Sequence, residues 1–250
     1  MANGCIAISR ILEKLDEHLG RNDYAAAERH LLYWLSESSG ACDSRTELLI
    51  RNELMGLYRK LGREADAMSC VSAALSKIEE MDISEQVGSA TTYLNAATVY
   101  KAFSRAADAI PLFERAKRIY ERELDAADSR LGGLYNNMAL ALVDLKRYDE
   151  AKALYLDAIE VMKKTEGGDL EVAITYLNLA SAAEAELGLV DADATIQKYL
   201  DDAELILELH QKRDGYYAFV CEKCASVFGY YGRFFYEKEL KDRAERIYRK

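Results

Sequence analysis

The chain has 250 residues, of which half are hydrophobic and 30% are charged, a composition typical of a folded globular protein rather than a disordered one. Its formal net charge of -10 argues against nucleic acid and anionic membranes as partners, because both favour a basic surface. A single proline and 14 glycines favour long helices over a β-rich fold.

The cysteines and the first residues of the chain bear on its compartment. The cysteines are odd in number and irregularly spaced, which argues against a disulfide scaffold and favours a reducing compartment. The first ten residues lack the basic region and the apolar run of a signal peptide. No stretch approaches the roughly 18 apolar residues that span a bilayer. We therefore expect a cytoplasmic protein.

Amphipathic helical patterns occur in pairs along the whole chain, each pair joined by a short polar turn. Between the first two pairs, the small polar residues from Ser36 to Ser44 predict a loop. Pro111 is expected in about the first turn of its helix, where a missing N–H costs least. In the helix after Gly188, the pattern leaves open whether Tyr199 or Leu200 faces the core. The predicted pairs occupy residues 6–41, 46–83, 88–125, 130–165, 171–210 and 215–249.

The same residue types recur about every 42 residues. Small residues recur together with a tyrosine and an asparagine, and this spacing predicts a repeat of helix pairs, an α-solenoid. The recurring sets are Tyr93, Tyr135 and Tyr176; Asn95, Asn137 and Asn178; and Ala97, Ala139 and Ala180.

These residues resemble the tetratricopeptide repeat, a helix-turn-helix in which small and bulky residues alternate. Its three small positions are matched by Ala97, Ala109 and Ala116, and again by Ala139, Ala151 and Ala158; its bulky positions are matched by Tyr100, Phe113, Leu142 and Tyr155. The period exceeds the standard 34 residues and is similar to the longer repeats of kinesin light chains. Met55 and Glu237 depart from the pattern, since each occupies a position that the family gives to a small residue.

The resemblance implies an all-α, right-handed superhelix of about six repeats in a single domain, residues 1–250, with a concave groove lined by the first helix of each repeat. It places Asn95, Asn137 and Asn178 on that groove, where their amides would grip the backbone of an extended peptide. In the alternative interpretation, these asparagines bond to the adjacent repeat and only fix the stacking. Selectivity for the peptide would come from neighbouring side chains: Arg59, Lys101, Asn136, Asp144, Ser181 and Glu184.

Two further features have a structural and a functional interpretation. Cys221 and Cys224 form a C-x-x-C motif, but the chain lacks a second cysteine pair for zinc, and we interpret both as core residues. The end of the chain is rich in aromatic residues, which form either a core with a partly exposed face or a surface for self-association. These aromatic residues are Tyr216, Tyr217, Phe219, Phe228, Tyr230, Tyr231, Phe234, Phe235, Tyr236 and Tyr248.

No catalytic motif is evident in the sequence, and we expect no enzyme activity, cofactor or metal. The function that the sequence favours is a scaffold that binds a protein or an extended peptide. One alternative is a regulatory sensor in which a short signalling peptide changes the superhelix. The other is a structural assembly factor that works by self-association through its aromatic C-terminal repeat.

Overall fold

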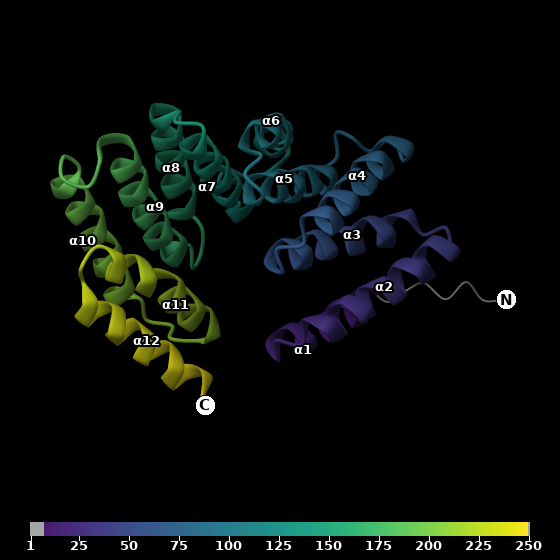
Figure 1. Ribbon diagram of the computed structural model, residues 1–250. Coiled ribbons are helices and arrows are strands. Elements are labelled where there is room, and N and C mark those ends of the chain that lie inside the picture. The colour runs from purple at the N-terminus through teal and green to yellow at the C-terminus, as the bar shows by residue number, and fades with distance from the viewer. Residues whose placement is uncertain (1–7, 250) are drawn as a thin grey trace. The chain divides into compact units, whose positions relative to one another are not determined.

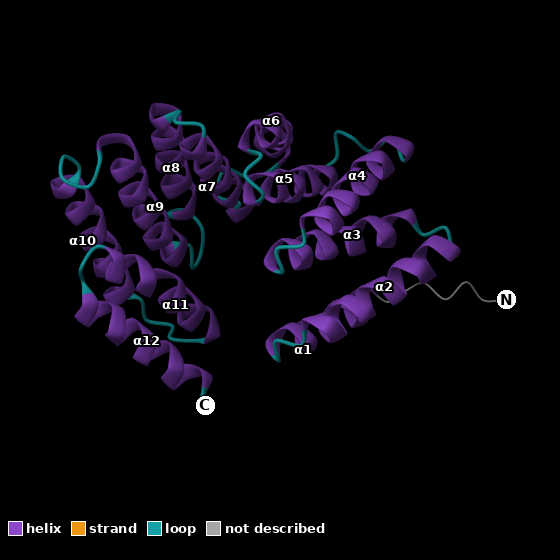
Figure 2. Cartoon of the chain, in the orientation of Figure 1, coloured by secondary structure: helices purple, strands orange, loops and turns teal. Residues whose placement is uncertain are grey.

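A computed structural model describes residues 8–249, and in this range the chain forms twelve helices and no strand (Figures 1 and 2). The predicted all-α fold is therefore confirmed. The start of the first predicted repeat, residues 6 and 7, lies outside the described residues, as does Cys5. The helices are α1 (Ile8–Gly20), α2 (Tyr24–Gly40), α3 (Ser44–Lys60), α4 (Glu64–Glu80), α5 (Val87–Ala102), α6 (Ala106–Glu123), α7 (Ser129–Asp144), α8 (Tyr148–Met162), α9 (Asp169–Leu187), α10 (Asp193–Leu209), α11 (Gly215–Tyr230) and α12 (Phe234–Tyr248).

The helices form two compact units. Unit 1 ends at Glu123 and contains α1–α6, and unit 2 begins at Leu124 and contains α7–α12. Within each unit, a helix packs mainly on the next helix in the chain, and the first helices of successive repeats also meet, as α3 meets α5 and α7 meets α9. This nearest-neighbour packing is that of a helical solenoid.

The turns inside the repeats share one geometry, except the turn between α9 and α10. A residue with positive φ follows the first helix, and the N–H of the next residue donates back to a carbonyl in the last turn of that helix. This bond caps the helix end and reverses the chain. The positive-φ residues are Asn22, Gly62, Ser104, Lys146 and Gly232, and the bonds run from Asp23 to His18, Arg63 to Tyr58, Arg105 to Tyr100, Arg147 to Leu142 and Arg233 to Phe228, each 2.9 Å long.

The loop predicted from Ser36 to Ser44 is wrong, because α2 continues to Gly40 and α3 begins at Ser44. Ser38 is buried in α2, and its hydroxyl donates to the Leu35 carbonyl at 3.0 Å. A serine can satisfy its hydroxyl within a helix in this way, so small polar composition alone did not mark a loop.

Two other details of the helices differ from, or complete, the sequence prediction. Pro111 lies in the second turn of α6 rather than in the first. Its ring nitrogen has no hydrogen to donate to the carbonyl of Ala107, so one helical hydrogen bond is missing there. In α10, Leu200 is fully buried, whereas Tyr199 is only partly buried and stacks on Tyr176. The structure therefore assigns the core position to Leu200.

The core of each repeat combines small and bulky side chains, as the pattern predicts. Ala97 and Ala139 are fully buried at the small positions of α5 and α7, and Phe113 is fully buried on α6. Glu237 is accommodated because the facing residue is Gly229, whose missing Cβ leaves room for the carboxylate. A glycine thus compensates for the departure from alanine in the last repeat.

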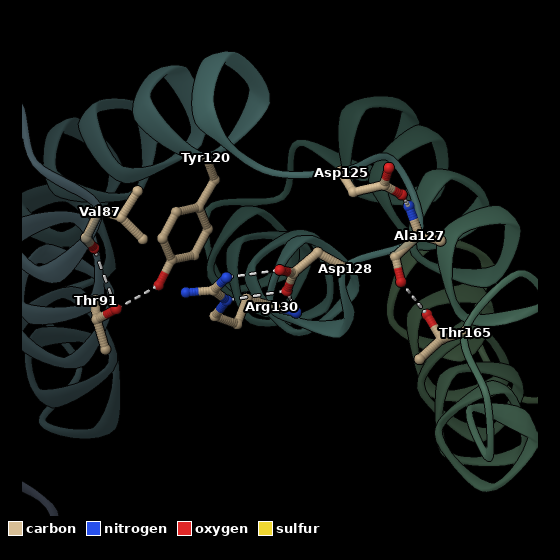
Figure 3. Close-up of polar contacts among 8 residues, drawn as sticks. All are labelled: Val87, Thr91, Tyr120, Asp125, Ala127, Asp128, Arg130 and Thr165. Atoms are coloured by element: carbon tan, nitrogen blue, oxygen red, sulfur yellow. Dashed lines mark hydrogen bonds and ion pairs between the residues drawn. The ribbon is translucent and has the colours of Figure 1, made fainter.

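Hydrogen bonds hold helices and connecting loops in place within each unit (Figure 3). In unit 1, the Thr91 and Tyr120 hydroxyls lie 2.7 Å apart and join α5 to α6. In unit 2, Asp128 caps α7 by accepting from the Arg130 N–H. The Thr165 hydroxyl donates to the Ala127 carbonyl at 2.8 Å, so the loop before α9 is held against the residues that precede α7.

We expect Gly168→Ala to lower the free energy of unfolding of unit 2 by about 1–3 kcal/mol, because the new methyl group overpacks a rigid site. Its Cβ would lie 2.3 Å from the Met162 carbonyl oxygen, a backbone atom that cannot move aside alone. Urea denaturation would measure the loss. Gly133→Ala is the matched control, since a Cβ at that helical position meets no atom within 4 Å; a similar loss in the control would contradict the steric explanation.

Candidate functional site

The asparagines of unit 1 form a chain of hydrogen bonds between two repeats. Asn95 on α5 donates through Nδ2 to Asn52 Oδ1 on α3 at 3.0 Å. Asn52 in turn donates to the Leu48 carbonyl at 3.0 Å and to the Thr92 hydroxyl at 2.9 Å. Asn52 therefore uses both amide hydrogens and its oxygen, while these bonds leave Asn95 with its Oδ1 and its second amide hydrogen.

Unit 2 repeats the bond between two asparagines. Asn178 on α9 donates to Asn136 Oδ1 on α7 at 3.0 Å. Asn137 differs, because it donates to the Gly133 carbonyl of its own helix at 2.8 Å. The inter-repeat bonds expected in the alternative interpretation are thus present at Asn95 and Asn178. They orient the amides without using all of their hydrogen-bonding groups, so ligand binding by the asparagines stays a prediction.

A pocket of about 420 Å³ opens beside the asparagine pair of unit 1, between α3, α5 and the loop that joins α4 to α5. Its polar lining includes Asn52, Glu53 and Asn95. Apolar side chains complete the walls: Leu48, Leu49, Met81 and Ile83. A pocket with apolar walls and a few convergent polar groups is the usual form of a ligand site.

Glu53 was not predicted as a site residue. It lies 42 residues before Asn95, the interval that separates Asn95 from Asn137, and so occupies the same position in the preceding repeat. Among residues 8–249, its carboxylate has neither a hydrogen-bond donor nor a cationic partner. Burial raises the pKa of Glu53, and the negative charge of Asp16 raises it further. The 42-residue period would have identified this position, but a comparison based on recurring asparagines missed it because the residue here is a glutamate.

The remaining predicted site residues have varied environments. Arg59, Lys101 and Asp144 occupy the last turns of α3, α5 and α7, and only Lys101 is partly buried. The Ser181 hydroxyl donates to the Leu177 carbonyl at 3.2 Å. Glu184 accepts hydrogen bonds from Tyr230 at 2.6 Å and Tyr231 at 2.7 Å, so its carboxylate joins α9 to the last repeat.

Unit 2 has a pocket of about 470 Å³ between α9, α10 and the loop before α9. Its walls include Tyr176, Leu205 and Gly167, with Asp169 and Asp202 among the charged lining residues. None of the predicted site residues lines it. Of the predicted groove residues, Asn95 lines the pocket of unit 1.

The C-x-x-C motif lies in the core of unit 2. Cys221 and Cys224 on α11 are both buried, and burial raises the pKa of Cys224 to about 12. Such a thiol is a poor nucleophile, because the reactive form is the thiolate. In the part of the chain that the structure describes, no three histidine, cysteine or acidic side chains come together as metal ligands. Likewise, no helix of residues 8–249 has the length and apolar character that a membrane span requires.

We expect Asn178→Ala to lower the free energy of unfolding of unit 2 by about 1–2 kcal/mol, because the partly buried Asn136 Oδ1 would lose its donor. Asn137→Ala should change it by less than about 0.5 kcal/mol, since the Asn137 amide donates to a carbonyl of its own helix. Equilibrium denaturation of the two variants would measure the difference. Equal losses would show that the inter-repeat bond is not what stabilises the stacking.

Comparison with known proteins places these helix pairs in a family. Models of the tetratricopeptide repeat match residues 89–129 and 130–204. A relative from Drosophila melanogaster, protein O-mannosyl-transferase Tmtc3, is 31% identical over 107 residues, which is 38% of this chain but only 12% of the relative. The chain therefore spans about an eighth of that protein.

Solved structures share the fold at low sequence identity. The nearly identical TPR-like repeats of a Podosopora anserina protein assigned to the kinesin light chains align with a TM-score of 0.57 and 17% identity, covering 82% of this chain and 95% of theirs. NprR in complex with its cognate peptide NprX aligns with a TM-score of 0.63 and 17% identity, covering 98% of this chain and 68% of NprR. The family models over residues 89–204, the repeated sequence pattern and the paired helices show that the chain is a tetratricopeptide repeat protein.

Proposed function

We propose that this protein is a scaffold that binds an extended peptide segment of a partner protein along the first helices of its repeats. Asn95, Asn137 and Asn178 would bond to the main chain of the segment. The fold supports the coarser part of this proposal, since helical solenoids present extended binding surfaces. The observation that carries the finer part is the pocket of unit 1, which Asn95 lines with an amide that Asn52 already orients.

An oriented amide is suited to binding a peptide main chain. Asn95 offers a carbonyl oxygen and an N–H, the groups that complement a backbone N–H and C=O. Because Asn52 fixes the rotation of this amide, little side-chain freedom would be lost on binding. Asn178 has the same arrangement with Asn136 in unit 2. The peptide in the NprR structure is a further support, since that protein shares the fold.

A peptide-display selection on the purified protein tests the proposal. The counter-screen uses Asn95→Ala, Asn137→Ala and Asn178→Ala combined, with circular dichroism and a cooperative melt to establish that the variant is folded. We expect enriched peptides that the folded variant no longer binds. The proposal fails if no peptide is enriched, or if the native protein and the variant enrich the same peptides equally.

A second function, self-association, is supported by the exposed aromatic side chains of the last repeat. Phe235 and Phe234 at the start of α12 are 96% and 67% exposed, and Tyr230 at the end of α11 is exposed as well. Apolar patches of this kind often mark an interface. Light scattering at increasing protein concentration would detect the association, and a constant monomer mass at high micromolar concentration would count against it.

A further inference from the structure

We propose that the pocket of unit 1 binds a lysine or arginine side chain of the bound segment, with the Glu53 carboxylate as its counter-ion. This inference rests on the proposed function and names the side chain that the site selects. Its three supports are the position of Glu53 in the repeat, the chemistry of the pocket walls, and the charges around the carboxylate.

Glu53 occupies the position in its repeat that is equivalent to the predicted groove asparagines. The corresponding position is an asparagine in each of the next three repeats: Asn95, Asn137 and Asn178. An asparagine amide is neutral and both donates and accepts, which suits a peptide main chain. An ionised carboxylate only accepts, and it forms its strongest hydrogen bonds with charged donors. In this repeat, a group that binds a cation therefore replaces the amide that would bind a peptide main chain.

The walls of the pocket match the stem of a basic side chain. Leu48, Leu49, Met81 and Ile83 supply apolar surface, and Glu53 supplies a charged end within the same 420 Å³ space. Lysine and arginine carry a chain of methylene groups that packs on apolar surface while the charged head reaches a polar partner. Asn95 lines the same pocket, so its amide can bond to the main chain of the residue whose side chain enters.

The local charges favour a cation from the ligand. Glu53 is partly buried on α3 and has no cationic partner among residues 8–249, and Asp16 on α1 adds a second negative charge near it. The cation among the pocket-lining residues is Arg45, which lies beside Asp43. The pKa of Asp43 is lowered by hydrogen bonds from Thr46 and by the charge of Arg45, so Arg45 already has a carboxylate close by. A bound ammonium or guanidinium would attract the Glu53 carboxylate and so offset the repulsion from Asp16.

The test compares Glu53→Gln with Glu114→Gln in the display selection. The first variant keeps the size of the side chain and removes an uncompensated charge, so its fold should be retained. Glu114 is an exposed glutamate on α6 that does not line the pocket, and its replacement removes the same charge from unit 1. We expect native protein and the control to enrich peptides with lysine or arginine at a fixed position, and Glu53→Gln to lose this preference.

Synthetic versions of the selected peptides then measure whether the basic side chain and Glu53 interact. Replacing the conserved lysine by norleucine, or the arginine by citrulline, should weaken binding to the native protein by about ten- to a hundredfold. The same replacement should have little effect on binding to Glu53→Gln. N-terminal acetylation should leave the affinity unchanged, which distinguishes the side chain from a terminal amine.

The outcomes separate the two proposals. Peptides that are enriched without a basic residue, or whose basic residue is unaffected by Glu53→Gln, would overturn the cation site while leaving peptide binding in place. Tight binding that depends on the free N-terminal amine would also overturn it. Failure to enrich any peptide would overturn the proposed function and the cation site together.

Discussion

Phe113→Ala is expected to lower the free energy of unfolding of unit 1 by about 3–5 kcal/mol. Phe113 is fully buried on α6, where it occupies the bulky position of the third repeat. Truncation removes most of the side chain from a packed site and leaves a cavity that its neighbours fill only in part. Urea denaturation followed by circular dichroism would measure the loss, which is large for a protein of ordinary stability.

Phe235→Ala is the matched control for this prediction. The change is chemically identical, but Phe235 is 96% exposed, so its removal should alter stability by less than about 0.5 kcal/mol. A ratio near one between the two losses would show that Phe113 does not lie in the core. A loss confined to Phe113→Ala would confirm the assignment of bulky positions in the repeat.

Arg243→Ala is expected to destabilise unit 2 by about 2–4 kcal/mol, below the range for a fully enclosed ion pair because both carboxylate partners reach solvent. Its side chain is 8% exposed and lies 2.7 Å from Glu208; it also pairs with Glu239 and donates to the Tyr217 hydroxyl at 3.0 Å. The change removes the cation that pairs with Glu208 and leaves a void beside α12, where the arginine side chain was packed. Chemical denaturation near pH 7 would measure the effect.

Arg249→Ala is the control, because Arg249 pairs with Glu245 on the surface and should contribute less than about 0.5 kcal/mol. The pH dependence gives a second check. A hydrogen bond from Arg243 lowers the pKa of Glu208 from its ordinary value of 4.5. The stabilisation from this pair is therefore complete above about pH 4.5, and is lost as the pH falls through the lowered pKa. In Arg243→Ala, the free energy of unfolding should therefore fall less steeply with decreasing pH below about 4.5. An unchanged pH dependence would show that the Arg243–Glu208 pair does not cause this loss.

The helices and their pairing were predictable because small residues recur at a fixed period. Ala97 and Ala139 are buried where two helices approach closely, and a larger residue at either position would separate them. This requirement appears in the sequence as alanines that recur about every 42 residues. The loop predicted from Ser36 to Ser44 had no such basis, since composition alone suggested it, and α2 continues through most of it.

The partners of the asparagines could not be predicted to the same extent. Asn95 bonds to a residue 43 positions earlier and Asn178 to one 42 positions earlier, because the rotation of each helix decides which side chain it meets. Glu184 was predicted on the groove, yet two tyrosines of the last repeat bind its carboxylate. These contacts depend on packing between repeats, which a pattern within one repeat does not specify.

The nearest-neighbour packing of the helices has a consequence for how the chain acquires its structure. Contacts between residues close in sequence form with little loss of loop entropy, so proteins built from them fold rapidly. In unit 1, a helix meets its main partners as soon as the next one or two helices exist. The residues up to Glu123 therefore have all the contacts of their compact unit before the second half has been synthesised. We expect this half to become protease-resistant on the ribosome while translation of α7–α12 continues.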